Sequence, residues 1–232
     1  MNAFTVLKDK QKIDLKGKLT TFINPYSYLY FRNNVQLFNE FDHLFLDGVL
    51  LVGLFRILGV KTSRYSFDMT SLAPKVFSDA VRQNQTIFII GSNQESIQDF
   101  VKVITSKYKG LPLVGYNQGF FKTPKERDRL LDHIANLSPD IVIVGMGTPL
   151  QEFFLIDLKN KGWSGFGYTC GGFIHQTIKK PNYYPTFFNT LNLRAIYRMI
   201  DEPKLISRYL FLYPKSIGLF IMDFIKSKQR FK

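Results

Sequence analysis

The sequence predicts an α/β fold in which a mostly parallel sheet carries helices on both faces. From about residue 80 to residue 172, short apolar segments typical of buried strands alternate with longer amphipathic segments typical of helices. The composition permits such a fold, because 45% of the 232 residues are hydrophobic and 16% are aromatic, enough to bury a substantial core. We expect one α/β core over residues 1–190, within which residues 1–75 could form a lobe of their own.

Each expected strand is short and apolar, and each is followed by turn-forming residues. The expected strands are 19–23, 44–46, 86–90, 113–114, 141–144 and 164–168, and the turns that end them begin at Asn24, Asp47, Gly91, Gly115, Gly145 and Cys170. The expected helices are 26–41, 49–58, 94–107, 125–137 and 151–161, and in the third of these apolar residues recur at spacings of three and four. Glycines after three of the strands favour a nucleotide crevice at one edge of a Rossmann-like sheet.

The segment 138–152 carries the strongest single pattern. Its apolar strand is followed by Gly145 and Gly147, which form a tight turn, and by Pro149, which fits the first turn of a helix. Backbone amides and a helix N-terminus can face an anion at such a turn. The side chains expected at its rim are Gln151 and Glu152. The alternative is a tight turn that binds no ligand.

The C-terminal segment is basic and apolar at the same time. The chain has a net charge of +13, and residues 203–232 contribute +6 of it, with seven basic residues and one acid interleaved with Leu, Ile and Phe. Such a segment can lie in a bilayer interface with its cations toward anionic headgroups. The alternative is a helix packed on the core with a solvated basic face. No run of 18 apolar residues occurs, and residues 1–18 do not resemble a secretion signal, so a spanning helix is not expected.

The sequence lacks the residues that several classes of catalytic or metal site require. Cys170 is the only cysteine, which excludes an intramolecular disulfide and a cysteine zinc cluster and fits a reducing compartment. The three histidines fall on separate elements without zinc-site spacing, and no Asp-x-Asp, P-loop or Gly-x-Ser-x-Gly elbow occurs. We therefore expect no metal site.

Four polar residues are candidates for chemistry. Asp47 could act as a general base or could belong to an Asp-Gly turn. Arg64 could pair with a phosphate or bridge Asp68, and Asn24 could form an Asx turn or contact a ligand. His175 could be a base, a hydrogen-bond donor or a packed structural histidine.

Six blocks in a fixed order carry a resemblance over nearly the whole chain. They are Asn24-Pro25, Asp47-Gly48, Gly115-Tyr116 with Gly119-Phe-Phe121, Pro139-Asp140 through Gly145-x-Gly-x-Pro-x-Gln-Glu152, Gly171-Gly172, and Tyr197-Arg198-x-x-x-Glu202-Pro203. The set resembles the WecG/TagA/CpsF glycosyltransferases, glycosyltransferase family 26. Its most specific parts are the blocks 140–152 and 194–203.

The resemblance implies an inverting transfer of a sugar from a UDP-sugar to an acceptor linked to a polyprenyl diphosphate. It implies a role in exopolysaccharide, capsule or teichoic acid synthesis, at the cytoplasmic face of the bacterial plasma membrane, with peripheral attachment and without a metal or other cofactor. It also implies that residues 191–232 form a basic appendage that helps complete the active site and touches the anionic membrane. Homo-oligomerisation stays open.

The resemblance and the residue patterns together assign three groups of site residues. The catalytic group is Asp47, as the general base, with Asn24, Arg64 and His175. The nucleotide-sugar group is Gly91, Gly115, Tyr116, Gly145, Gly147, Gln151, Glu152, Gly171 and Gly172. The group that meets the diphosphate from the appendage of residues 191–232, or C-terminal arm, is Arg194, Arg198 and Arg208.

Three departures from the family pattern leave the donor sugar and the acceptor open. Phe22 stands where the family often has Thr, Phe67 where it has Gly, and Ile174-His175 where it has Phe-Asp. The alternative interpretation is a basic nucleic-acid-binding α/β protein without catalytic activity, but the charge is concentrated in an apolar tail and no nucleic-acid-binding motif occurs. A Rossmann-type oxidoreductase is disfavoured, because no full Gly-x-Gly-x-x-Gly follows the first strand.

Overall fold

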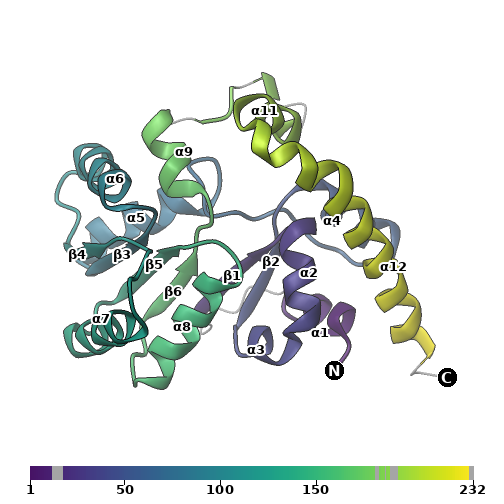
Figure 1. The fold of residues 1–232 in the computed structure, drawn as a ribbon, viewed down its shortest axis with the longest axis horizontal. Helices are drawn as coiled ribbons and strands as arrows, with labels where there is room; N and C mark the ends of the chain where they lie inside the picture. Colours follow the sequence, from purple (N-terminus) through teal and green to yellow (C-terminus); the bar gives the residue numbers. More distant parts are fainter. Residues whose placement is uncertain (12–17, 181–182, 186, 189–192, 230–232) are drawn as a thin grey trace.

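A six-stranded parallel sheet runs through the centre of the molecule, in the order β2-β1-β6-β5-β3-β4 (Figure 1). The computed structural model describes residues 1–11, 18–180, 183–185, 187–188 and 193–229. The strands are β1 (Leu19–Ile23), β2 (His43–Leu46), β3 (Ile87–Gly91), β4 (Leu113–Asn117), β5 (Ile141–Gly145) and β6 (Phe166–Thr169). Every pairing between these strands is parallel, as expected where helices connect successive strands.

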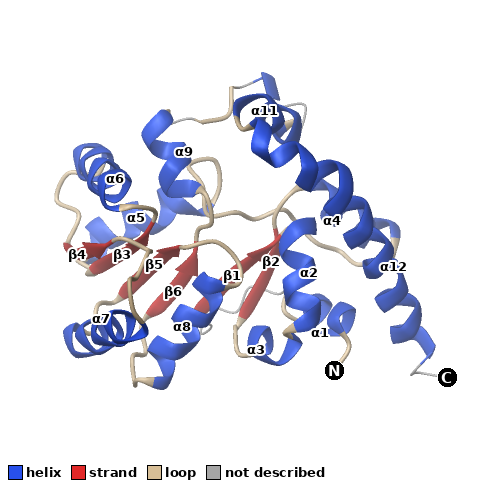
Figure 2. Cartoon of the chain, in the orientation of Figure 1, coloured by secondary structure: helices blue, strands red, loops and turns tan. Residues whose placement is uncertain are grey.

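Helices cover both faces of this sheet, as Figure 2 shows. They are α1 (Ala3–Asp9), α2 (Pro25–Asn33), α3 (Val35–Asn39), α4 (Val49–Ile57), α5 (Leu72–Gln83), α6 (Gln94–Lys107), α7 (Pro124–Leu137), α8 (Leu150–Asn160), α9 (Phe173–Lys179), α11 (Arg194–Asp201), the 3₁₀-helix η1 (Pro203–Leu205), the π-helix η2 (Arg208–Leu212) and α12 (Tyr213–Gln229). One hydrophobic cluster joins the sheet to α1, α2, α3, α7 and α8, and a second joins it to α5, α6 and α9.

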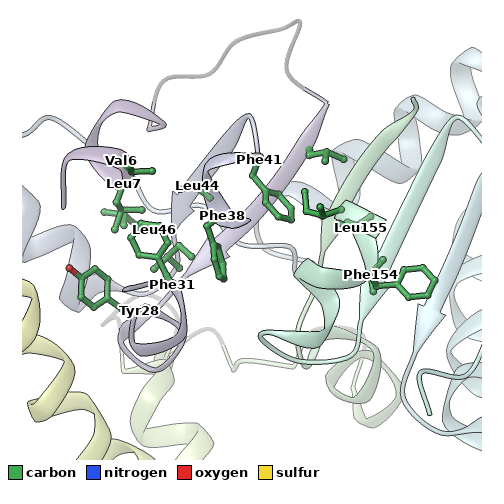
Figure 3. Packing of buried hydrophobic residues seen from close by; sticks show 14 of the residues in the cluster. Val6, Leu7, Tyr28, Phe31, Phe38, Phe41, Leu44, Leu46, Phe154 and Leu155 are labelled. Atoms are coloured by element: carbon green, nitrogen blue, oxygen red, sulfur yellow. The ribbon is translucent and has the colours of Figure 1, made fainter. Parts of the chain in front are cut away.

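Strand β3 shows why a strand inside the sheet can be apolar throughout. Phe88 and Ile90 belong to the first cluster, whereas Ile87 and Ile89 belong to the second. A strand that is buried on both faces has no position for a solvated side chain, so the usual alternation of apolar and polar residues disappears. Figure 3 shows part of the first cluster, in which side chains from α1, α2, α3, β2 and α8 pack together.

The predicted α/β fold is confirmed, with corrections at particular residues. The helix expected at 26–41 is two helices, because the backbone of Asn34, with φ −128° and ψ 38°, leaves the helical region between them. Gly115 lies inside β4 rather than after it, and Pro149 immediately precedes α8 rather than opening it. The sequence expectations also lacked α1, α5 and α9.

The first 75 residues share the sheet with the rest of the chain. Strand β1 pairs with β6 on one side and with β2 on the other, so β1 lies inside the sheet. The separate lobe over residues 1–75 stays a prediction, and so does the division between a core and an appendage. The boundary expected at residues 190–191 lies outside the described residues.

The C-terminal helix α12 is built into the first hydrophobic cluster. The ring of Phe220 is fully buried, and its centroid lies 5.6 Å from that of Phe4, 5.5 Å from Tyr28 and 5.3 Å from Phe55. Edge-to-face and tilted contacts of this kind add to the free energy gained by burying the rings. One face of α12 therefore packs on the core, as the alternative interpretation of the tail expected.

A buried ion pair fixes the same helix. Asp223 accepts hydrogen bonds from Arg32 Nε at 2.7 Å and from the Tyr28 hydroxyl at 2.9 Å, both on α2. A carboxylate with two donors is far less costly to bury than one without partners. The ion pair therefore holds α12 against α2.

The opposite face of the tail is apolar and exposed. Its exposed large side chains are Ile206, Leu210, Phe211, Ile221, Met222 and Ile225. Among the described residues, the stretch Pro203–Gln229 is the one helix that is long and apolar enough to cross a membrane by length and composition, and an 18-residue window within it has a mean hydropathy of 1.2. Charged residues interrupt this stretch, so the sequence still has no run of 18 apolar residues, and the absence of a spanning helix stays a prediction. Phe220 and Asp223 hold this helix on the protein.

Phe220→Ala should lower the free energy of unfolding by about 3–5 kcal/mol, because it removes a fully buried ring and leaves a cavity beside α1 and α4. Urea denaturation followed by circular dichroism measures the change. Ile225→Ala, on the same helix at a side chain that is 50% exposed, is the matched control and should cost less than about 1 kcal/mol. Equal, small effects at the two positions would contradict the packing of α12 into the core.

Candidate active site

A cavity of about 590 Å³ opens at the carboxyl edge of the sheet, where β1, β2, β5 and β6 end. Since parallel strands end at the same edge, the residues that follow them converge there. Figure 1 places α9 and α11 beyond this edge, and the C-terminal arm supplies one wall of the cavity. The expected site residues that line it are Asn24, Asp47, Arg64, Gly147, Gln151, Gly171, Gly172, Arg194, Arg198 and Arg208.

Six expected site residues are not in the lining: Gly91, Gly115, Tyr116, Gly145, Glu152 and His175. Packing accounts for the glycines among them. A Cβ atom on Gly91 would lie 2.4 Å from the Gly145 carbonyl oxygen, and one on Gly115 would lie 2.4 Å from the Phe88 ring. His175 is exposed on α9, and the 39% exposed Tyr116 lies on the edge strand β4. The functional roles assigned to these six residues stay predictions.

Asn24 begins α2 and lines the cavity. Its side-chain oxygen accepts from the backbone amides of Tyr26 and Ser27, each at 3.0 Å, and the Ser27 side chain accepts from the Asn24 amide, which completes a capping box. An Asx-type cap and a ligand contact, the two alternatives that the sequence left open for Asn24, are therefore compatible with one geometry. The oxygen caps the helix, and the amide nitrogen is the group that can meet a ligand.

Asp47 follows β2 directly, and its backbone amide donates to the Ile23 carbonyl at 2.9 Å. The next residue, Gly48, has φ +92, a left-handed conformation that favours glycine, and it turns the chain into α4. The Asp47 carboxylate is 35% exposed and faces the cavity. Enclosure raises the pKa of Asp47 above its ordinary value, Arg64 opposes the rise, and Asp68 adds to it.

Arg64 lies beside Asp47 because its backbone pairs with Leu46, the last residue of β2. Leu46 forms a parallel bridge with Arg64, and the Tyr65 amide donates to the Leu46 carbonyl at 3.0 Å. The guanidinium lies 3.5 Å from Asp47 Oδ1 and 3.1 Å from Asp68 Oδ2. The bridge to Asp68, one of the two roles considered for Arg64, is therefore present, and the guanidinium still lines the cavity.

Gln151 and Glu152 were both expected at the rim, and only Gln151 is there. Its Oε1 accepts from the Gly171 amide at 3.1 Å and so ties α8 to the glycine turn after β6. Glu152 lies beneath, fully buried, and its Oε1 accepts from Thr21 Oγ1 at 2.8 Å and from Thr148 Oγ1 at 3.0 Å. Burial raises the pKa of Glu152, although hydrogen bonds from Gln151, Thr21 and Thr148 oppose the rise.

The C-terminal arm brings three arginines to the cavity. Arg194 pairs with Asp68 at 3.1 Å, and Arg198 pairs with Glu202 at 2.9 Å. The guanidinium of Arg208 lies 3.8 Å from the centroid of the Tyr26 ring, within the range of a cation–π interaction. With Arg64, these residues make the cavity positive, which suits an anionic ligand such as a diphosphate.

Sequence reasoning missed two sets of residues in this region. The first is a group of aromatic side chains around the cavity, Tyr26, Phe120, Tyr184, Tyr209 and Tyr213. The second is a set of buried threonines, in which Thr169 lines the cavity and its Oγ1 donates to Thr21 Oγ1 at 2.8 Å. The threonines had a visible signal, because Thr20 and Thr21 are polar residues within an expected buried strand. In the part of the chain that the structure describes, no group of three or more His, Cys, Asp or Glu could hold a metal ion.

Comparison with known proteins gives a consistent set of relatives. The family model for the "Glycosyl transferase WecG/TagA/CpsF family" matches residues 4–230. A Shigella boydii protein, named UDP-Gal:alpha-D-GlcNAc-diphosphoundecaprenol beta-1,4-galactosyltransferase, is 34% identical over 206 residues, which cover 88% of this chain and 86% of that protein. A Bacillus subtilis (strain 168) protein, named N-acetylglucosaminyldiphosphoundecaprenol N-acetyl-beta-D-mannosaminyltransferase, is 24% identical over 209 residues, 88% of this chain and 79% of that protein. A Bacillus spizizenii protein of the same name is 26% identical over 165 residues, 70% of this chain and 62% of that protein.

The stability of the wild-type protein relative to Glu152→Gln should fall as the pH rises from about 4.5, the ordinary pKa of Glu. The folded-state pKa of Glu152 lies above its unfolded value, so the folded state binds the extra proton in that window, and raising the pH removes this contribution. Above the folded pKa the difference should be constant. Unfolding free energies of both proteins across the pH range measure the effect.

Glu95→Gln, at an exposed position on α6, is the matched control for this measurement. A difference between wild type and Glu152→Gln that does not change with pH would show that Glu152 is ionised in the folded state as readily as in the unfolded state.

Proposed function

The chain belongs to the WecG/TagA/CpsF family of glycosyltransferases, and on this premise we propose that it transfers a sugar from a UDP-sugar to a saccharide carried on a polyprenyl diphosphate. One observation carries the proposal beyond the family: a carboxylate with a raised pKa, Asp47, faces a cavity at which four arginines converge. A general base and an anion site in one cavity are what this transfer requires.

The acceptor class follows from the relatives. The names of all three specify an acceptor in which N-acetylglucosamine is joined to diphosphoundecaprenol. We propose an acceptor of the same class and a role in the synthesis of a cell-surface polymer. The relatives' names differ in the sugar that is transferred, so UDP-galactose is the first donor to test because it belongs to the relative that is 34% identical.

The proposed reaction inverts the anomeric centre. Asp47 takes the proton from an acceptor hydroxyl, and the oxygen attacks the anomeric carbon from the face opposite the diphosphate. The bond from that carbon to the diphosphate breaks, and UDP leaves. The raised pKa of Asp47 improves its ability to hold the proton, as long as the carboxylate stays ionised at the working pH.

Arginines and backbone amides are proposed to stabilise the departing diphosphate without a metal. Charge that develops on a leaving group is stabilised best by donors that are already oriented toward it. Arg64 is held by Ser66 and Asp68, and Arg194 is held by Asp68, so both guanidinium groups are oriented before a ligand binds. The glycine turns at Gly147 and Gly171 line the same cavity and allow close approach of the backbone.

The tail is proposed to attach the protein peripherally to the cytoplasmic face of the membrane. Its exposed apolar side chains include Leu210, Phe211 and Ile225, and exposed Lys215 and Lys228 lie on the same helical stretch. Such a surface can insert apolar groups at the acyl boundary while its cations meet anionic headgroups. The acceptor's lipid would then lie at the same surface. The nucleic-acid alternative gains no support from the cavity, and homo-oligomerisation stays a prediction.

Asp47→Asn should lower kcat by about 10²- to 10⁴-fold and leave UDP affinity nearly unchanged, because it removes the base and keeps the shape of the cavity. Release of UDP from a panel of UDP-sugars, with an N-acetylglucosaminyl diphosphoprenol acceptor, measures kcat. Isothermal titration measures UDP binding. Asp132→Asn, on the exposed surface of α7, is the matched control. Near-normal turnover by the Asp47 variant would exclude Asp47 as the base.

Removing the charges of Lys215 and Lys228 together should weaken binding to anionic vesicles by about 30-fold, since each cation near such a surface contributes about 1 kcal/mol. Flotation with vesicles that contain a defined fraction of anionic lipid, at two salt concentrations, measures the affinity. Removing the charges of Lys75 and Lys102, exposed on α5 and α6, is the control. Equal losses in both variants, or tighter binding to RNA than to vesicles, would argue against the membrane proposal.

A further inference from the structure

Asp68 is the point at which the core, Arg64 and the C-terminal arm meet. Its Oδ2 accepts from Arg64 at 3.1 Å, from Ser66 Oγ at 2.7 Å and from Arg194 at 3.1 Å. Its Oδ1 accepts from the Thr70 amide at 2.7 Å and the Thr70 hydroxyl at 2.5 Å. The side chain is only 13% exposed, so these five donors surround a nearly buried carboxylate.

We propose that Asp68 is a positioning residue that couples the closure of α11 over the cavity to the orientation of Arg64 beside Asp47. This inference rests on the proposed function, in which Asp47 is the base. Asp68 touches no reacting atom. It acts through the two arginines that it holds.

The first part of the argument concerns the sharing of Arg64. One terminal nitrogen of its guanidinium donates to Ser66 at 2.7 Å, lies 3.1 Å from Asp68, and lies 3.5 Å from Asp47. The contacts of this nitrogen with Ser66 and Asp68 are therefore shorter than its contact with Asp47. Asp68 therefore holds Arg64 back from a tight ion pair with Asp47. A tight pair would favour the ionised form of Asp47 and make it a weaker base.

The second part concerns the arm. Helix α11 has no buried residue, and the ring contacts of its Tyr197 are with Tyr183, Tyr184 and Phe188, which precede it in the chain. At its first turn, Arg194 donates to Asp68 and, at 2.6 Å, to Thr70 Oγ1, and its guanidinium lies 4.7 Å from the Tyr184 ring centroid. At its last turn, Asp201 accepts from Lys179 at 2.9 Å. Asp68 is therefore the buried core-side partner of the turn that carries Arg194 toward the cavity.

Asp68 carries its negative charge at neutral pH. Burial by itself would raise the pKa of Asp68. Hydrogen bonds from Thr70 and Ser66 outweigh burial, with help from the charges of two arginines, and hold the pKa below its ordinary value. The carboxylate therefore stays ionised at neutral pH and keeps its hydrogen bonds with Arg64 and Arg194.

Other groups that face Asp47 must be considered in any pH measurement. They come from the segment 64–68, from α11, from the chain before it, and from η2 and α12, and they are Arg64, Asp68, Arg194, Arg198, Tyr184, Tyr209 and Tyr213. Among them Asp68 raises the pKa of Asp47, whereas Arg194 lowers it. Removing Asp68 should therefore lower the pKa of Asp47, and removing Arg194 should raise it.

Asp68→Asn and Arg194→Ala, in the full-length chain, provide the test. In Asp68→Asn the acidic limb of the kcat/KM pH profile should move to lower pH, because Arg64 is free to pair with Asp47, and kcat should fall about 10- to 100-fold. In Arg194→Ala the limb should move to higher pH. In both variants the backbone amides of α11 should exchange hydrogen faster than in wild type, while Asp68→Glu should restore part of the protection.

The two measurements separate the inference from the proposed function. Hydrogen exchange of α11 does not depend on turnover. It therefore tests whether Asp68 stabilises the position of α11 even if the protein accepts no UDP-sugar as a substrate. Asp79→Asn on α5 is the control for loss of a carboxylate, and melting curves check that each variant folds. Shifts of the acidic limb in the same direction in both variants, or unchanged α11 exchange in folded Asp68→Asn, would overturn the inference.

Discussion

The parallel direction of all six strands is the constraint on which the candidate site depends. Because the strands run the same way, the residues that follow β1, β2, β5 and β6 meet at one edge although they are far apart in the chain. Each is then fixed locally: Asn24 caps α2, Asp47 continues the ladder to Ile23, and Gln151 binds the turn at Gly171. The site is therefore held by the hydrogen bonds of the sheet and of helix starts.

A buried polar network lies beneath this edge and joins three elements that the cavity needs in register. Thr169 on β6 donates to Thr21 on β1, and Thr21 donates to Glu152 on α8. Only one oxygen of Glu152 has a partner among the described residues, and its raised pKa favours the neutral acid, which is the less costly form to bury. In an otherwise apolar core, such a network favours one register over its neighbours, because a shift would leave several polar groups unpaired.

The sequence predicted the strands well because runs buried on both faces are mostly apolar, as in β3 and β5, and it predicted part of the site because that part follows strand ends. It could not distinguish two uses of glycine. Gly147 lines the cavity, whereas Gly91 lets its own strand approach Gly145, and both occur after an apolar run. Nor could it decide which of two adjacent residues at a helix start faces inward, so Glu152 was placed at the rim. Helix α5 was missed despite a clear signal, since its buried residues recur at spacings of three and four (Ala73, Val76, Phe77 and Ala80).

The C-terminal arm shows the limit of counting charges. A count of the basic residues in the tail includes Arg208 among the cations that could meet a membrane. In the structure, Arg208 lies over the Tyr26 ring at the cavity instead. The two helices of the arm are attached differently. Phe220 and Asp223 anchor α12 in the core, whereas α11 has no buried residue and is tied by ion pairs to Asp68 and to Lys179 of α9. Because Arg194 of α11 is held by the charge of Asp68, a new negative charge in the cavity competes for the same guanidinium and acts on the position of α11. Under the proposed function that charge is the diphosphate of the donor. Since it would contact arginines of both the core and the arm, donor binding and closure of the arm must stabilise each other.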